Sequence, residues 1–276
     1  MESRTAPPGI SLGPMRLATW NVNSIGARLP RLLEWLEDSQ PDVLCLQETK
    51  ITDDAFPTLP ISALGYEIES NGDGRWNGVA ILSRVGFDDV TRGLPNAPGF
   101  PDVGSPQESR AIGATCAGLR VWSVYVPNGR EVASEHYDYK LRWLTALNAT
   151  VAAELPGHAR FVVTGDFNIA PTDADVWDPA VFAGSTHVTE PERSAYRSLL
   201  GLGLVDLEAR PLKGDHPFTY WDYRAGSFHK GMGMRIDLVL ASRSVSDSVT
   251  DAYVDREARK GKGPSDHAPV VVDLTD

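Results

Sequence analysis

Asp166 and Asn168 are the pair of residues with the clearest chemical potential in this sequence. They follow an apolar run at residues 161–163 that is typical of a buried strand, and Gly165 ends that run. In an extended backbone, side chains at i and i+2 lie on the same side, here at the mouth of whatever cleft the strand enters. A carboxylate and an amide held there could bind a metal ion or position a water molecule beside a phosphate. Gly, Asp and Asn are equally expected where a strand simply turns, so this pair alone leaves both interpretations open.

Other predicted strands carry polar residues at their ends in the same way. These residues are Asn21, Glu48, Asn128, Asp237, Asp266 and His267. Each one taken singly is more often structural than catalytic. Together they provide carboxylates for a hard cation, a His–Asp pair and neutral hydrogen-bond donors, the equipment of metal-assisted phosphate ester hydrolysis. The chain has no P-loop, no Gly-rich dinucleotide fingerprint and no CxxC motif, and His267 lacks a partner at zinc-site spacing, which disfavours a zinc hydrolase.

Alternating apolar strands and amphipathic helices must position these residues. Buried strands are predicted at 16–20, 43–46, 78–82, 112–119, 120–126, 159–167, 236–241 and 269–274. Apolar residues at helical spacing predict helices over 29–36, 137–155 and about 194–200, whereas the Pro- and Gly-rich residues 91–107 predict a surface loop. No short repeat and no Pro/Ser linker interrupts this pattern. We therefore expect a flexible tail at 1–14 and a single domain over 15–276.

The composition is that of a soluble globular protein, with 42% hydrophobic and 23% charged residues among 276. No run of about 18 apolar residues predicts a transmembrane helix, and residues 1–14 lack the apolar core of a secretory signal. Cys45 and Cys116 both lie in apolar runs, which favours buried thiols in a reducing compartment over a disulfide or a metal site. A cytoplasmic protein without membrane attachment is expected.

The formal net charge of −11 argues against a protein that coats nucleic acid without specificity. It leaves room for a nuclease with a local basic face, because attraction depends on how charge is distributed. One such cluster lies between residues 256 and 262, where Arg256, Arg259, Lys260 and Lys262 stand against Glu257. A solvated loop and a phosphate-contacting loop are equally good interpretations of it.

Six motifs, taken as a set and in this order, resemble the exonuclease III family of the endonuclease/exonuclease/phosphatase superfamily. They are WNVNS (20–24), LQETK (46–50), YVPNG (125–129), GDFNIAPTD (165–173), RIDLVLAS (235–242) and SDHAPV (265–270). The resemblance implies an α/β (α+β) fold, a four-layer sandwich of two packed mixed β-sheets flanked by helices. It implies a Mg²⁺-dependent hydrolase, with Mn²⁺ as a substitute, acting on double-stranded DNA at abasic sites and damaged 3′ ends. We expect a cytoplasmic monomer that associates with the nucleoid when it acts on DNA.

The resemblance also implies a role for each matching residue at the metal. Glu48 would be the principal metal ligand, with Asn21 and Asp266 assisting directly or through water. Asp166 would orient or deprotonate the attacking water. Asn168 would hold that water or the phosphate, and would join Asp166 in any second metal site.

A second implied group recognises the substrate. His267, oriented by Asp237, would bind the scissile phosphate, and Tyr125 and Asn128 would donate hydrogen bonds to it. Asn23 stands where some eukaryotic members have Asp, which leaves its role as a ligand open.

The family stretches that surround a flipped abasic sugar correspond to FTYWDYR (218–224) and GMGMRID (231–237). They nominate Tyr220, Met234 and Ile236 as walls of a small apolar pocket, while Trp221 is better interpreted as a core residue.

Two alternatives differ from a repair nuclease. A phosphatase or phosphodiesterase of the same superfamily would act on lipid or inositol head groups, and FTYWDYR disfavours it. A catalytically inactive DNA-binding or scaffold protein would share only the fold. Retention of Glu48, Asp166, Asn168, Asp237 and His267 disfavours this second alternative, because an inactive site needs no such set.

Overall fold

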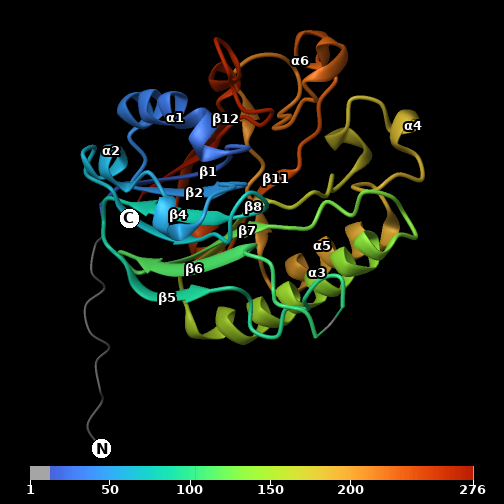
Figure 1. The fold of residues 1–276 in the computed structure, drawn as a ribbon, viewed down its shortest axis with the longest axis horizontal. Coiled ribbons are helices and arrows are strands. Elements are labelled where there is room, and N and C mark those ends of the chain that lie inside the picture. Colours follow the sequence, from blue (N-terminus) through green and yellow to red (C-terminus); the bar gives the residue numbers. More distant parts are fainter. Residues whose placement is uncertain (1–12, 103, 276) are drawn as a thin grey trace, which may run out of the picture.

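Two mixed β-sheets packed face to face form the centre of this computed structural model, which describes residues 13–102 and 104–275 (Figure 1). The first sheet has the strand order β10 (Arg210–Pro211), β12 (Val249–Val254), β13 (Val270–Leu274), β1 (Met15–Asn21), β2 (Val43–Gln47), β4 (Val79–Ser83) and β3 (Glu67–Asn71). The second has the order β5 (Asp88–Arg92), β6 (Ala111–Cys116), β7 (Leu119–Tyr125), β8 (Phe161–Asp166), β11 (Asp237–Ala241) and β9 (Val205–Asp206).

Helices cover the outer face of each sheet. The long helices are α1 (Ile25–Ser39) beside the first sheet, and α3 (Glu135–Glu154) and α5 (Glu190–Gly201) beside the second (Figure 1). Four short helices complete the set: α2 (Thr58–Ser62), α4 (Pro179–Phe182), α6 (Ser227–Lys230) and α7 (Arg243–Ser246). Five 3₁₀ turns lie at Asp53–Ala55, Leu155–Gly157, Asp173–Asp175, Arg224–Gly226 and Arg256–Arg259. The predicted four-layer sandwich is confirmed.

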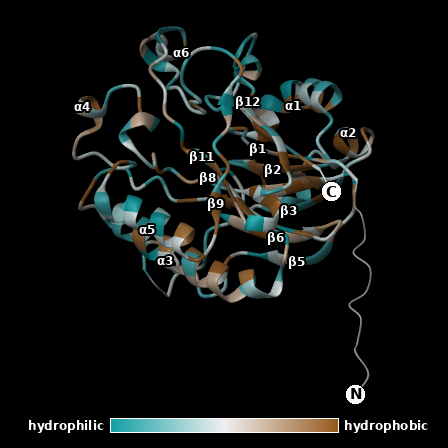
Figure 2. Cartoon of the chain, turned by 180° about the vertical axis from the view of Figure 1, so that it is seen from behind, coloured by the Kyte–Doolittle hydropathy of each residue, from teal (hydrophilic) through white to brown (hydrophobic). Residues whose placement is uncertain are grey.

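Both faces of the central strands are buried, which explains their unbroken apolar sequence. In β2, Val43 and Cys45 enter the core between the sheets, whereas Leu44 and Leu46 pack under α1. Trp143 and Leu147 of α3 close a third core against the second sheet. Seen from behind in Figure 2, hydrophobic residues follow the strands and hydrophilic ones cover much of the helices.

The helix ends follow from local capping. The Ser24 side chain accepts the Ala27 N–H at the start of α1, and Thr189 and Glu192 form a capping box at the start of α5. These caps place both helices four residues earlier than the predicted starts at 29 and about 194.

The predicted buried strands are confirmed, with one correction. Residues 112–119 are not one strand, because Ala117 and Gly118 adopt positive φ and turn the chain between β6 and β7. The predicted loop at 91–107 begins inside β5. Three strands with charged, partly exposed residues, β3, β5 and β12, carry no apolar run that would predict them.

Cys45 and Cys116 are buried free thiols, as predicted. Most of the expected tail, residues 1–12, lies outside the described residues. Within residues 13–102 and 104–275, no helix combines the length and apolarity that crossing a bilayer needs.

Candidate active site

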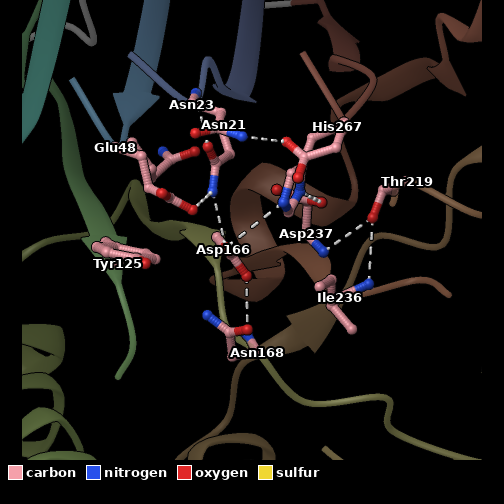
Figure 3. A network of polar contacts seen from close by, with 12 residues as sticks. Asn21, Asn23, Glu48, Tyr125, Asp166, Asn168, Thr219, Ile236, Asp237 and His267 are labelled. Carbon is pink, nitrogen blue, oxygen red and sulfur yellow. Dashed lines mark hydrogen bonds and ion pairs between the residues drawn. The ribbon is translucent and has the colours of Figure 1, made fainter. Parts of the chain in front are cut away.

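One edge of the sandwich, where the two sheets meet, gathers the predicted site residues. Asn21 ends β1 and Glu48 follows β2, both from the first sheet. Asp166 ends β8 and pairs in register with Asp237, the first residue of β11 in the second sheet. His267 precedes β13, which returns antiparallel to β1, so each sheet contributes about half of the site (Figure 3).

A compact acidic cluster forms the centre. One ligand atom each from Glu48, Asp166 and His267 all lie within 4.8 Å of one another. Asn21 joins the two carboxylates, because its Nδ2 donates to Glu48 Oε1 at 2.7 Å and to Asp166 Oδ2 at 2.9 Å. Two nearby carboxylates are a donor set that suits a hard cation such as Mg²⁺, which keeps several of its own waters.

Lys50 contacts the same carboxylate that would bind the metal. Its Nζ lies 2.7 Å from Glu48 Oε2 and donates to Asn23 Oδ1 at 2.6 Å. Burial alone would raise the pKa of the Glu48 carboxyl, but Lys50 outweighs burial and lowers that pKa below its ordinary value. Glu48 is therefore an anion at neutral pH.

Asn23 and Asp266 lie just outside the acidic cluster. Asn23 Nδ2 donates to Asp266 Oδ1 at 3.0 Å, and the Asn23 N–H donates to Asn21 Oδ1 at 3.0 Å. The Asn21 side-chain nitrogen thus donates to the two carboxylates, and its side-chain oxygen accepts the Asn23 backbone N–H. In this arrangement it orients Glu48 and Asp166.

His267 is held by Asp237 in a fully buried pair. Its Nδ1 lies 2.8 Å from Asp237 Oδ2, and its Nε2 lies 3.9 Å from Asp166 Oδ2. Burial alone would lower the pKa of His267, but the charge and hydrogen bond of Asp237 raise it to about 10. The Thr219 hydroxyl accepts the backbone N–H groups of Ile236 and Asp237 and so fixes the start of β11.

The pKa of Asp166 differs from that of Glu48 because, among the described residues, no lysine forms an ion pair with the Asp166 carboxylate. Burial, reinforced by Asp237 and Glu48 and partly offset by His267, raises the pKa of Asp166 to about 7. A carboxyl with such a pKa suits proton transfer near neutral pH.

Asn168 reaches the site by a turn and not by an extended backbone, so the predicted i, i+2 geometry is wrong. Its φ is +49°, a region that Asn tolerates better than most residues. The turn lets the Asn168 N–H donate to Asp166 Oδ1 at 2.9 Å. Asn23 and Glu48 also have positive φ, of 44° and 51°. Such strained residues persist only where the surrounding structure enforces them.

Asn128 and His187 both contact the Asn168 side chain. Asn128 Nδ2 donates to Asn168 Oδ1 at 3.1 Å, and His187 Nε2 lies 3.0 Å from the same oxygen. Burial and the charge of Lys140 lower the pKa of His187 to about 3, so its ring is neutral. In the tautomer with its proton on Nε2, neutral His187 donates to Asn168 Oδ1; in the other tautomer, Nε2 accepts from Asn128 Nδ2, 3.3 Å away.

Behind these amides lies a buried ion pair that no motif in the sequence predicts. Lys140 of α3 and Glu192 of α5 are fully buried and lie 2.5 Å apart. Lys140 Nζ donates to the carbonyl oxygens of Asn168 at 2.6 Å and of Asn128 at 3.3 Å. In the sequence these residues look like ordinary helix-surface charges; only packing of α3 against α5 reveals the pair. The one available signal is the capping box that includes Glu192.

Tyr125 stands at the end of β7 on the Glu48 side of the site (Figure 3). The Arg110 guanidinium carbon lies 4.7 Å from the centre of the Tyr125 ring, and Arg110 Nε donates to Glu108 at 2.5 Å. Burial raises the pKa of Tyr125 well above its ordinary value, so the phenol keeps its proton and can donate it in a hydrogen bond.

The three residues nominated for the sugar pocket do come together. Met234 and Ile236 belong to one apolar cluster against which Tyr220 packs, and the Tyr220 ring centre lies 5.0 Å from that of His267. Met234 and Ile236 are buried in this cluster, whereas Tyr220 is half-buried. Trp221 is a core residue, as predicted.

The basic cluster at 256–262, for which the sequence allows either a solvated loop or a phosphate-contacting loop, is partly buried. Arg259 is buried and donates to the carbonyl oxygens of Ser265 and Trp221, and Arg256 donates to that of Phe228. These hydrogen bonds hold residues 256–265 against Trp221 and Phe228. Lys260 and Lys262 remain exposed.

Comparisons with known proteins agree with this geometry. A family model described as the Endonuclease/Exonuclease/phosphatase family matches residues 18–267. Exodeoxyribonuclease III of Haemophilus influenzae is 30% identical over 272 residues, covering 93% of this chain and 98% of that protein. A solved 3′-5′ exonuclease (NExo) from Neisseria meningitidis has a TM-score of 0.89 and 39% identity, covering 95% of this chain and all of that one. A solved AP endonuclease from Archaeoglobus fulgidus has a TM-score of 0.87 and 36% identity, covering 95% and 99%.

Proposed function

Because this chain belongs to the endonuclease/exonuclease/phosphatase family and is a DNA repair nuclease of the exodeoxyribonuclease III type, we propose a specific pair of reactions for it. It cleaves the phosphodiester 5′ to abasic sites in duplex DNA, and it removes nucleotides or blocking groups from 3′ ends. Mg²⁺ is the proposed cofactor, with Mn²⁺ as a substitute. We also propose that it acts as a monomer on DNA in the cytoplasm.

The observation that best supports this proposal is the cluster of Glu48, Asp166 and His267, whose ligand atoms lie within 4.8 Å of one another. Glu48 would be the principal ligand of the metal, which would neutralise negative charge on the phosphate. His267 would donate from Nε2 to a phosphate oxygen while Asp237 holds Nδ1. Asp166 would take the proton of the attacking water, and its contact with the Asn168 N–H fixes its orientation.

Neutral donors complete the phosphate site. Tyr125 and Asn128 would donate to phosphate oxygens from the side opposite His267, and Asn168 would hold the attacking water. Preorganised donors of this kind stabilise charge where it develops in the transition state.

A panel of labelled duplexes tests the proposal. The duplexes carry an abasic site, a recessed 3′ end or a 3′-phosphate, and each is incubated with Mg²⁺ or with EDTA. We expect cleavage 5′ to the abasic site and release of 3′ nucleotides or phosphate with Mg²⁺, and none with EDTA. Hydrolysis of inositol phosphates without hydrolysis of any duplex would contradict the proposal.

A further inference from the structure

A cavity of about 350 Å³ opens next to the acidic cluster, and its far end has no role in the proposed chemistry. It shares Glu48, Tyr125 and Asn128 with the site and continues past them to Trp76. In Figure 3, Glu48 and Tyr125 lie on one side of Asp166, and Thr219 and Ile236 lie on the other. A phosphodiester bound at Asp166 therefore has the apolar cluster containing Ile236 on one side and this cavity on the other.

Trp76 is exposed although it is a large aromatic residue, with 64% of its surface accessible. Large aromatic side chains usually bury most of their area. The Arg75 guanidinium carbon lies 4.9 Å from the centre of the indole ring and covers one face of it. Most of the Trp76 side chain is nevertheless accessible to a planar group from outside the protein.

The backbone beside Trp76 is fixed to the segment that carries Glu48. The Lys50 N–H donates to the Asn77 carbonyl at 2.9 Å, and the Thr49 N–H donates to that of Gly78 at 3.1 Å. Gly78 has a φ of +91°, and a Cβ there would lie 2.2 Å from Thr49 Oγ1, so no larger residue fits. These hydrogen bonds fix the segment that follows Trp76 relative to the segment that follows Glu48.

Aromatic and cationic groups line the rest of the cavity. The Phe100 ring stacks on His136, with ring centres 4.5 Å apart and planes at 23°. Arg130 adds positive charge in a molecule whose net charge is −11, whereas the charge of Arg110 is offset by Glu108, which also lines the cavity. Aromatic faces for bases, combined with cations for the backbone, are the chemistry by which proteins bind an unpaired nucleic acid strand.

We propose that this cavity is a nucleobase subsite, in which Trp76 stacks on a base that flanks the scissile phosphate. The proposal rests on the proposed nuclease function and extends it from the phosphate to a neighbouring nucleoside. The subsite would contribute affinity for DNA and not the chemical step, since Trp76 touches none of the reacting groups.

Trp76→Ala and Trp76→Phe test the stacking. Binding of a duplex with a recessed 3′ end is measured by fluorescence anisotropy with Ca²⁺ in place of Mg²⁺. Base–aromatic stacking is worth about 1–3 kcal/mol, so Trp76→Ala should weaken binding about 5- to 150-fold, while Trp76→Phe keeps most of the affinity. Leu59→Ala, an 85% exposed residue of α2 outside the cavity, serves as the control and should bind like wild type.

Removing single bases from the DNA then identifies the base that stacks on Trp76. Each nucleotide around the scissile phosphate is replaced in turn by a baseless analogue. At the stacked position, the replacement should weaken wild type as much as Trp76→Ala does, and should not weaken Trp76→Ala further. Independent effects at every position would overturn the subsite while the nuclease function stands. A wild-type protein that binds duplexes but cleaves none with Mg²⁺ would instead contradict the proposed function alone.

Discussion

Glu48, which is half-buried, and Asp166, which is buried, are neighbouring carboxylates, yet their surroundings differ. Lys50 lies 2.7 Å from Glu48, whereas Asp166 accepts hydrogen bonds from two neutral groups, the Asn21 amide and the Asn168 N–H, and His267 Nε2 lies farther away, at 3.9 Å. The first environment keeps a carboxylate charged and ready for a cation. The second favours a carboxylate that exchanges a proton.

This contrast predicts different defects for Glu48→Ala and Asp166→Asn. Raised Mg²⁺ should partly restore Glu48→Ala, because that variant lacks mainly a metal ligand. Asp166→Asn should lose roughly 10²- to 10⁴-fold in kcat while keeping its affinity for DNA, because general-base catalysis contributes about that much. The measurements are single-turnover rates across a Mg²⁺ titration and a binding isotherm. Full rescue of Asp166→Asn by Mg²⁺, with none for Glu48→Ala, would reverse the two roles.

At the scale of elements, α3 and α5 support the site through the pair of Lys140 and Glu192. The charge of Lys140 outweighs burial and lowers the pKa of Glu192 below its ordinary value. Glu192 therefore contributes stability above its unfolded pKa, about 4.5, and this contribution is lost as the pH falls through the lower folded value. Burial outweighs Glu192 at the other partner and lowers the pKa of Lys140, which offsets part of this stabilisation.

Lys140→Met should therefore destabilise the protein by about 3–5 kcal/mol at neutral pH, because it leaves Glu192 buried and unpaired. The difference in Tm from wild type should shrink as the pH falls below about 4.5 and through the lower folded pKa of Glu192, beyond which Glu192 is neutral in both proteins. Lys260→Met, which breaks the exposed pair with Glu257, should cost at most about 1 kcal/mol. A Tm difference for Lys140→Met that is independent of pH would show that charge pairing is not the cause.

The strands and helices also show how much of the structure can be predicted from the sequence alone. Buried central strands such as β2 and β8 are continuous apolar runs, so their ends, and with them Glu48 and Asp166, are predictable. The strands β3 and β5 contain charged, partly exposed residues and no such run. The turn at Asn168 and the meeting of Lys140 with Glu192 depend on contacts between distant segments, which local pattern does not encode.

At the scale of the whole molecule, an acidic protein must bind an acidic polymer. Arg256 and Arg259 already donate hydrogen bonds to carbonyl groups of the protein, so fewer of their N–H groups are available for a phosphate. The exposed Lys262 is the better candidate for a phosphate contact.

Lys262→Gln should weaken duplex binding and reduce the slope of log K against log salt by about 0.9, the value for one lost phosphate contact. Arg259→Ala should instead lower Tm, since its guanidinium holds the Ser265 and Trp221 carbonyl groups. Arg243→Gln is the matched control, because Arg243 follows the end of β11 opposite Asp237. A salt slope equal to that of wild type in Lys262→Gln would place the DNA elsewhere.

The pairing of β13 with β1 has a consequence for when activity can arise during synthesis. Asn21 leaves the ribosome early, but His267 and the strand that anchors it leave more than two hundred residues later. A nascent chain that ends before residue 267 has the acidic cluster without its histidine and the first sheet without its β13 strand. We therefore expect nuclease activity to arise only after residues 267–274 have been synthesised and β13 has paired with β1.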